Sequence, residues 1–354
     1  MRPALKPLIV AAFLAMAGPA HADPPRIGLA APLTGPSALL GKQMQDGATL
    51  AARQAGAQLL SADDECSAEG GEAAAHELVQ ENVAIVVGFL CSEAIEAALP
   101  VLKDAGIPVI TPGVRANGLT DQRIRSHWPV WRLASRADAE AGAVGEILSR
   151  RWRTEHFAIV DDGTLYGREL AESLRLAVEL AGLQPVLVDT FRPQMENQIG
   201  LVGRLARAGA SHVFVGGDRD DIAIMARDAA SRDHDLVFAG GEALRAASEI
   251  PLAQGALMIA PPEWADLMDE STREDFAAAA LIPDGYVAPA FAAVEIALQA
   301  MQRALASGAS IADTLGGDVF QTVIGRVAFD AKGDLADNPF ILQRYDGERF
   351  LPVE

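Results

Sequence analysis

Short apolar runs alternate with longer amphipathic stretches along most of the chain. The runs are rich in β-branched residues, as buried strands are, while the stretches between them repeat apolar residues at helical spacing. The predicted strands are Ile27–Ala31, Ala84–Val87, Val109–Ile110, Phe157–Val160, Val186–Val188, His212–Val215 and Val237–Ala239. The predicted helices are Met44–Ala55, Gly71–Glu81, Ser92–Asp104, Glu140–Arg151, Arg168–Ala181, Leu201–Ala208 and Asp220–Ala230. This alternation indicates βα units and parallel sheets, so we predict an α/β fold.

The order of the later elements favours two discontinuous lobes. A second βα series begins near Phe157 and ends at Leu257–Ile259, and a long helical pattern, Tyr286–Leu305, follows without a complete sheet of its own. We predict two Rossmann-like lobes, one made of residues 23–134 and 260–323 and the other of residues 135–259 and 324–354. The hinge crossovers are expected near Trp131–Ser135, Ile259–Trp264 and Thr322–Arg326.

The N-terminus is typical of a secretory leader. Arg2 and Lys6 precede an apolar run, Leu8–Met16, and the small-x-small pattern Ala20-His21-Ala22 follows. The run is too short to span a bilayer. A lipoprotein would need a cysteine at the cleavage point, and this sequence has none there. We expect a signal peptide over residues 1–22, cleavage near Asp23 and release into a periplasm. The alternative is an uncleaved N-terminal helix.

Composition narrows the class of partner. The chain has 48 acidic and 29 basic residues, a net charge of −19, which would repel nucleic acid and anionic lipid. We therefore expect no nucleic-acid partner. Half of the 354 residues are apolar, and a chain of this length usually organises more than one core.

Cys66 and Cys91 are the only two cysteines of the chain. Thiols oxidise in an exported protein, so we predict a disulfide between them. It would close a loop of 25 residues (91 − 66) and stabilise the fold by about 3 kcal/mol. A metal site is not expected, because no histidine pair accompanies the two sulfurs.

With these elements placed, several segments in order resemble the periplasmic leucine/isoleucine/valine-binding protein family. The resemblance spans Ile27 to Tyr345. Its segments are Ile27-Gly28-Leu29-Ala30-Ala31-Pro32-Leu33-Thr34-Gly35-Pro36, Gly88-Phe89-Leu90-Cys91-Ser92, Ile110-Thr111-Pro112-Gly113, Tyr166-Gly167, Phe238-Ala239-Gly240-Gly241-Glu242 and Phe329-Asp330-Ala331-Lys332-Gly333-Asp334-Leu335. It implies the type I periplasmic binding fold, a monomer, and an ABC permease as the membrane partner.

The resemblance also implies a ligand site. Ser92 and the loop after Thr111 would hold a ligand carboxylate, Glu242 would accept the ligand's ammonium group, and Tyr166 would close over the ligand from the other lobe. All follow predicted strands, where ligands of parallel α/β sheets bind. The alternatives are a helix cap for Ser92, lobe packing for Tyr166 and a solvent-facing loop for Glu242.

One loop departs from the family. After Gly113 the family usually has a small residue and then a threonine, whereas this chain has Val114 and Arg115. The backbone donor to a carboxylate is therefore Gly113, Val114 or Arg115. Arg115 either faces the cleft, where its planar fork would bind a carboxylate, or points to solvent or to Asp121. In the cleft it would favour a ligand with an additional or displaced acid group.

The sequence contains none of the common catalytic motifs. The chain lacks G-x-S-x-G, H-E-x-x-H, a Walker loop, and G-x-G-x-x-G after its first strand, and its histidines lack metal-ligand spacing. We expect no cofactor, no metal and no catalysis. The predicted function is capture of an amino acid or similar amine- and carboxylate-bearing solute by hinge closure. The alternatives are a ligand-sensing receptor of the same fold and, more distantly, an exported hydrolase.

Overall fold

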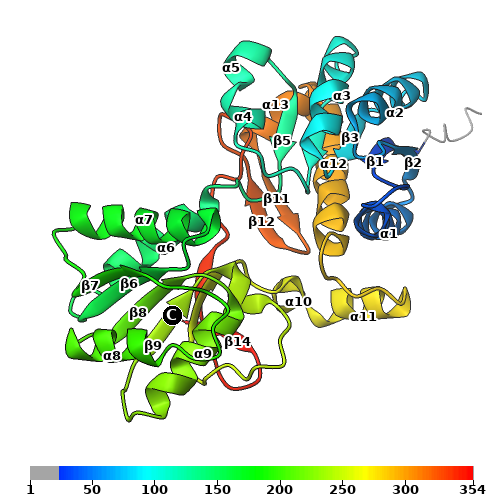
Figure 1. Cartoon of the computed structure of the whole chain (residues 1–354). Coiled ribbons are helices and arrows are strands. Elements are labelled where there is room, and N and C mark those ends of the chain that lie inside the picture. The colour runs from blue at the N-terminus through cyan, green and yellow to red at the C-terminus, as the bar shows by residue number, and fades with distance from the viewer. Residues whose placement is uncertain (1–23, 354) are drawn as a thin grey trace, which may run out of the picture.

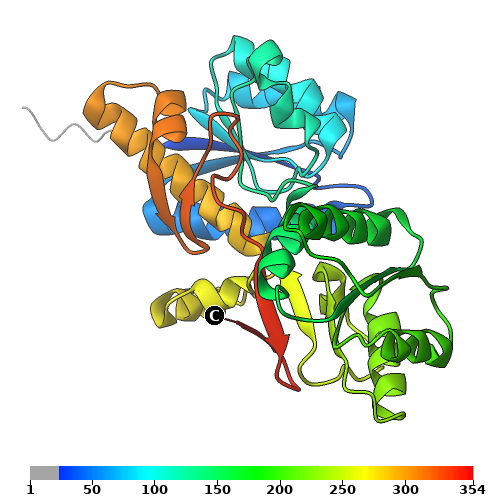
Figure 2. The ribbon, with the colours of Figure 1, turned by 90° about the vertical axis from the view of Figure 1, so that its left-hand side faces the viewer.

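A computed structural model describes residues 24–353, which form two α/β lobes stacked on each other and joined by three passages of the chain (Figures 1 and 2). The predicted leader, residues 1–22, lies outside the described residues. Within residues 24–353, no helix is both long enough and apolar enough to cross a membrane.

The first lobe is built on a sheet of five parallel strands in the order β2-β1-β3-β4-β5. Its strands are β1 (Arg26–Ala31), β2 (Gln58–Asp63), β3 (Ile85–Gly88), β4 (Val109–Thr111) and β5 (Val130–Arg132). One face is covered by α1 (Ala38–Ala55) and α12 (Val287–Ser307), and the other by α2 (Ala68–Gln80) and α3 (Ser92–Asp104). Two short helices, α4 (Gly118–Asp121) and α5 (Arg123–Ser126), connect β4 to β5.

Small residues allow the two helices on the first face to approach closely. A side chain at Gly47 of α1 would place its Cβ 2.0 Å from the carbonyl oxygen of Val287 in α12. Buried alanines line both helices, so backbones rather than long side chains meet there. This contact joins an early segment of the chain to a late one, as a discontinuous lobe requires.

The second lobe is built on a seven-stranded sheet in the order β14-β13-β10-β9-β8-β6-β7. Five strands are parallel: β6 (Phe157–Asp161), β7 (Leu187–Thr190), β8 (His212–Gly216), β9 (Val237–Gly240) and β10 (Leu257–Ala260). The antiparallel edge is β13 (Ile341–Tyr345) and β14 (Phe350–Pro352). The faces are covered by α6 (Ala139–Arg151) with α7 (Leu165–Leu180), and by α8 (Ile199–Arg207) with α9 (Arg219–Ala230) (Figure 1).

A 3₁₀ turn, η1 (Glu242–Arg245), connects β9 to β10 in the second lobe. The remaining elements lie between β10 and β13 in sequence and pack mainly on the first lobe: α10 (Trp264–Leu267), α11 (Glu270–Ala278), α13 (Ile311–Gly317) and the hairpin β11 (Val319–Thr322) with β12 (Gly325–Ala328). Phe320, Val327 and Phe329 share one core with β1 and α12.

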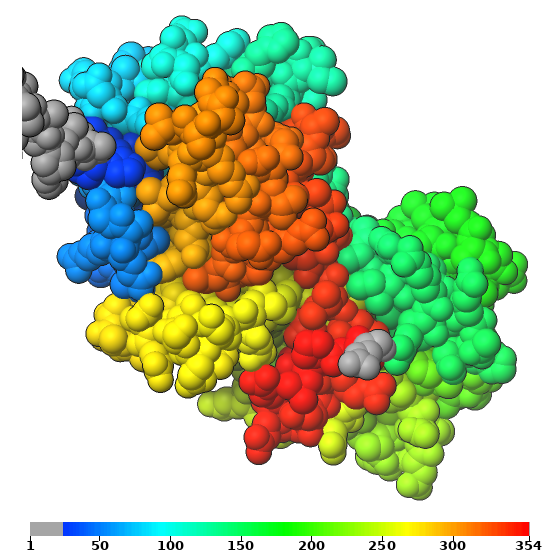
Figure 3. All heavy atoms as spheres, turned by 180° about the vertical axis from the view of Figure 1, so that it is seen from behind, coloured from blue at the N-terminus to red at the C-terminus, as the bar shows by residue number. Residues whose placement is uncertain are grey.

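The structure therefore differs from the predicted exchange of lobes at residues 323–324. That position is the tight turn of the β11–β12 hairpin, where Gly325 has a φ of +97°, and both strands pack on the first lobe. The chain stays there through the bridge between Phe329 and Leu335 and then passes to β13. Figure 3 shows this passage from the orange surface of the first lobe to the red C-terminal residues beside the second.

The predicted α/β class with two parallel sheets is confirmed. Each predicted helix overlaps an observed one, and the predicted strand at Val186–Val188 overlaps β7, which begins one residue later and ends two residues later. The sequence did not reveal β2, β5 or the late strands β11 to β14.

Candidate functional site

A cavity of about 790 Å³ lies between the two lobes. The first lobe contributes the loop after β4, the start of α12 and the β11–β12 turn, while the second contributes η1 and the residues around β13. All three chain passages line it, at 133–135, at 261–263 and with Asp337, Pro339 and Phe340. A solute in this cavity would touch both lobes and the segments that connect them.

Arg115 and Glu242 face each other across this cavity. Arg115 follows β4, and Glu242 follows β9 and opens η1, so each side chain lies at the carboxyl end of a parallel strand. The Nη1 atom of Arg115 is 3.8 Å from the Oε2 atom of Glu242, and the side chains are 43% and 35% exposed. Of the two orientations left open for Arg115, the structure thus has the cleft-facing one. Asp121 is instead paired with Arg136 and Lys332.

The three residues of the loop after β4 are placed differently. Gly113 and Arg115 line the cavity. Val114 is only 1% exposed, belongs to the core of the first lobe, and donates its N–H to the hydroxyl of Thr111 at 3.2 Å. We therefore remove Val114 from the candidate site, because its side chain and its amide are both engaged in the fold.

Ser92 is the first residue of α3, and the N-cap is Cys91. The helix-cap alternative for Ser92 therefore does not hold, but Ser92 is half-buried and is not among the residues that line the cavity. As the first residue of α3, Ser92 has a backbone N–H that belongs to the first turn of the helix and has no partner within it.

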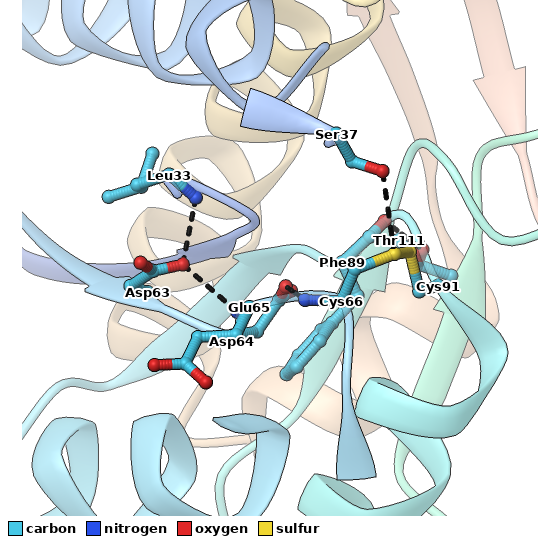
Figure 4. Close-up of a disulfide and its surroundings, with 9 residues drawn as sticks. All are labelled: Leu33, Ser37, Asp63, Asp64, Glu65, Cys66, Phe89, Cys91 and Thr111. Carbon is cyan, nitrogen blue, oxygen red and sulfur yellow. Dashed lines mark hydrogen bonds between the residues drawn. A yellow bond between two sulfur atoms is a disulfide. The ribbon is translucent and has the colours of Figure 1, made fainter. Parts of the chain in front are cut away.

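The predicted disulfide between Cys66 and Cys91 is present, with 5.2 Å between the Cα atoms (Figure 4). It joins the loop after β2 to the start of α3, next to the buried side chain of Thr111. The hydroxyl of Ser37 donates to the Sγ atom of Cys66 at 3.7 Å. The disulfide and this hydrogen bond together connect the loops that follow β1, β2 and β3.

Tyr166 lies in the second lobe, at the start of α7, and its hydroxyl is engaged by a residue that the sequence did not reveal. It donates to the Oε1 atom of Glu140 in α6 at 2.8 Å, and the same oxygen accepts the N–H of Glu242 at 2.6 Å. Burial raises the pKa of Glu140, and burial with the neighbouring Glu140 charge raises that of Tyr166. Tyr166 and Glu140 therefore hold the backbone of Glu242 through hydrogen bonds within the second lobe.

Gly241 is required by this packing. A Cβ there would lie 2.2 Å from the Oε1 atom of Glu140 and 2.6 Å from the hydroxyl of Tyr166. The Gly-Gly-Glu sequence after β9 thus allows Glu140 to reach the backbone of Glu242.

The cavity has further walls that the sequence did not indicate. Tyr286 stands close enough to Arg115 and Glu242 for both charges to affect its pKa, which burial raises. Trp264 and Phe340 also line the cavity, next to two of the chain passages. Arg245 forms an ion pair with Glu263 at 2.9 Å. Among residues 24–353 there is no group of three or more His, Cys, Asp or Glu side chains able to hold a metal ion.

Two α/β lobes around a cavity with charged and apolar walls define a cleft-type binding protein. The family model described as periplasmic binding protein matches residues 24–349. The chain therefore belongs to the periplasmic binding protein family, whose members bind solutes and are not enzymes. The predicted resemblance and the type I fold are confirmed.

Individual proteins similar to this chain agree with the family assignment. The chain is 28% identical over 340 residues, 92% of this chain and 90% of the relative, to the leucine-, isoleucine-, valine-, threonine-, and alanine-binding protein of Pseudomonas aeruginosa. A Rhodospirillum rubrum structure assigned to branched-chain amino acid ABC transport is 19% identical, with a TM-score of 0.78 over 93% of this chain and all of that one. A substrate-binding protein from Desulfitobacterium hafniense in complex with Leu is 20% identical, with a TM-score of 0.65 over 94% of this chain and all of that one.

Proposed function

We propose that the protein captures an amino acid, or a close analogue of one, for an ABC importer. The observation that carries the proposal is the pair of opposite charges, Arg115 and Glu242, that face one another across the cavity from different lobes. A free amino acid carries the complementary pair. Its carboxylate would replace Glu242 as the partner of Arg115, and its ammonium group would replace Arg115 as the partner of Glu242.

The apolar walls of the cavity suit the side chain of such an amino acid. Leu133, Trp264, Tyr286 and Phe340 give apolar surface beside the charged pair. The first-lobe loop at Gly113 and the helix start at Ser92 remain candidates for backbone and hydroxyl donors to the carboxylate. Tyr166 acts through Glu140 and Glu242, since its hydroxyl is already bonded within the second lobe.

Hinge closure would bring the two halves of the site onto the ligand. The hinge in this proposal is the three passages at 133–138, 261–263 and 336–340, with the lobes made of the elements on either side. Arg136 in the first passage forms an ion pair at 2.9 Å with Asp334, which lies two residues before the third passage. These two passages would therefore move together, and closure would present a distinct surface to a membrane permease.

The proposal includes export and release. The leader would be cleaved between Ala22 and Asp23, and the mature protein would act in the periplasm as a monomer. Mass spectrometry of the protein secreted by a bacterial host would find a mature N-terminus at Asp23.

Calorimetry with the twenty common amino acids tests the proposal. We expect at least one to bind wild-type protein. Glu242→Gln should bind it at least about 30-fold more weakly, the lower end of the 2–5 kcal/mol cost of removing one partner of a charged contact. Glu249→Gln, an exposed acid in the loop after η1, is the matched control and should bind as the wild type does. If no amino acid binds, or if Glu242→Gln binds equally well, the proposal fails.

A further inference from the structure

Glu140 is a buried acid behind the proposed ligand site. It lies in the first turn of α6 and is 7% exposed. Its Oε1 atom accepts two hydrogen bonds, from the hydroxyl of Tyr166 at 2.8 Å and from the backbone N–H of Glu242 at 2.6 Å. The hydroxyl of Tyr166 in turn accepts the N–H of Ala243 at 3.4 Å. One carboxylate oxygen therefore organises the whole turn that carries Glu242.

We infer that Glu140 is a positioning residue of the ligand site, which fixes Glu242 toward the cavity and adds a second negative charge behind the position of the ligand's amine. The inference rests on the proposed function, because it gives Glu242 the role of ammonium acceptor. It names the ligand class more narrowly: a solute whose amine is charged, and not a carboxylic acid that lacks one.

Geometry alone does not require a charge at this position. A glutamine would offer a carbonyl oxygen to the same two donors without the cost of burying an ion. Both hydrogen-bond partners of Oε1 are neutral groups. The burial of Glu140 raises its pKa, as does the nearby charge of Glu242, while the two hydrogen bonds and Arg115 lower it. Keeping an acid where it costs stability is expected when its charge serves binding.

The charges of the site explain what this second acid would do. Glu242 lies close enough to Glu140 for its charge to raise the pKa of Glu140, and Arg115 is the cation that faces them. The site thus holds one negative charge in excess when both acids are ionised. An ammonium group is attracted by this excess, whereas an acid without an amine would add a further negative charge.

The crowding at Gly241 makes the arrangement specific. A Cβ at that position would overlap both Glu140 and Tyr166, so only a glycine allows the backbone to pass this close to the buried acid. The N–H of Glu242 is held by this contact, and the side chain of Glu242 is left to point into the cavity.

The test compares Glu140→Gln with wild-type protein in affinity and in stability. The probes are L-leucine and its deaminated analogue 4-methylpentanoate, or the tightest-binding common amino acid and its deaminated acid if leucine is not bound. Glu140→Gln should bind the amino acid about tenfold more weakly, corresponding to about 1.4 kcal/mol, and should bind the deaminated acid no more weakly than the wild type. Its melting temperature at pH 7.5 should be higher, because a buried carboxylate whose desolvation outweighs its two hydrogen bonds has been removed.

The sign of the stability effect follows from the raised pKa. Below the ordinary pKa of a glutamate, Glu140 is protonated in both the folded and the unfolded wild-type protein. The melting temperatures of the variant and the wild type should therefore be alike near pH 4 and separate as the pH rises. Glu146→Gln is the matched control. It removes an exposed acid from the same helix, paired with Arg150, and should change neither ligand's affinity.

Three results would overturn the inference. Equal affinity of Glu140→Gln and wild type for the amino acid would show that the charge has no part in binding. A lower melting temperature with an equal loss for both probes would mean a purely structural residue. If wild-type protein binds none of the twenty amino acids, the proposed function fails first and this inference falls with it.

Discussion

Replacing Arg115 with alanine tests the ligand site through two opposing effects. In the structure, the Nη1 atom of Arg115 is 3.8 Å from the Oε2 atom of Glu242, and both side chains are more than a third exposed. Such a pair is stabilised by at most about 1 kcal/mol, since water screens it. Removing Arg115 therefore frees Glu242 for an ammonium group, and this gain in ligand affinity is at most about 1 kcal/mol.

The loss is larger than this gain. A guanidinium bound to a ligand carboxylate makes charge-assisted hydrogen bonds worth about 1.5–3 kcal/mol each. With the gain subtracted, Arg115→Ala should lose about 2 kcal/mol in binding an amino acid, which is about 30-fold in Kd. Arg115→Lys should lie between the two, because an ammonium keeps the charge without the planar fork.

Isothermal titration calorimetry with two probes separates the effects. For L-leucine, or the amino acid that binds best, Arg115→Ala should show the 30-fold loss. For the corresponding amine without a carboxylate, 3-methylbutylamine in the case of leucine, its affinity should be unchanged or improved. Arg150→Ala, an exposed arginine on α6, is the control and should alter neither. Undiminished affinity of Arg115→Ala for the amino acid, or an equal loss for the amine, would refute the reasoning.

Three predictions concern stability. Replacing both Cys66 and Cys91 with alanine should lower the free energy of unfolding in urea by about 3.5 kcal/mol, given the 25-residue separation, and a reducing agent should have no further effect; a loss below about 1 kcal/mol would contradict this. Asp334→Ala leaves the fully buried Arg132 unpaired and should cost about 3–5 kcal/mol in the same assay, whereas an unchanged midpoint would show the pair to be dispensable. Burial raises the pKa of Glu295 to about 7, so wild-type stability should fall as the pH rises from 4.5 through 7. Calorimetry of Glu295→Gln should show a smaller fall, and parallel pH profiles would count against the raised pKa.

The sheets could be predicted where hydrophobic patterning is strong. The buried strands β3, β6 and β8 are continuous apolar runs, because helices cover both of their faces. The edge strand β2 is largely half-exposed and mixes serine and aspartate with its leucines, so its pattern resembles a loop. The segment around Gly325 is a hairpin turn and not the predicted hinge, since a glycine between short apolar runs fits either structure.

The site could be predicted in part. The resemblance selected Glu242 and the Arg115 loop, and both line the cavity, but nothing local in the sequence relates one to the other, because they come from different lobes. Glu140 was missed since an acid in the first turn of a helix is expected from the helix dipole alone. Its second role depends on a glycine that lies far along the chain, at Gly241.

The charge balance of the cavity argues against a ligand with an additional acid group, the preference that Arg115 suggested from the sequence. Arg115 is already paired with Glu242, and Arg245 with Glu263, so neither offers a free cation. The acids that line the cavity outnumber the arginines: they are Glu242, Glu263, Asp266, Asp284 and Asp337, against Arg115, Arg245 and Arg326. A second carboxylate would enter a negative field, whereas one carboxylate and one amine would exchange partners with an existing pair. In the proposed site, Arg115 would therefore favour a zwitterion with an apolar remainder, and it would set the position of the carboxylate rather than the number of acid groups.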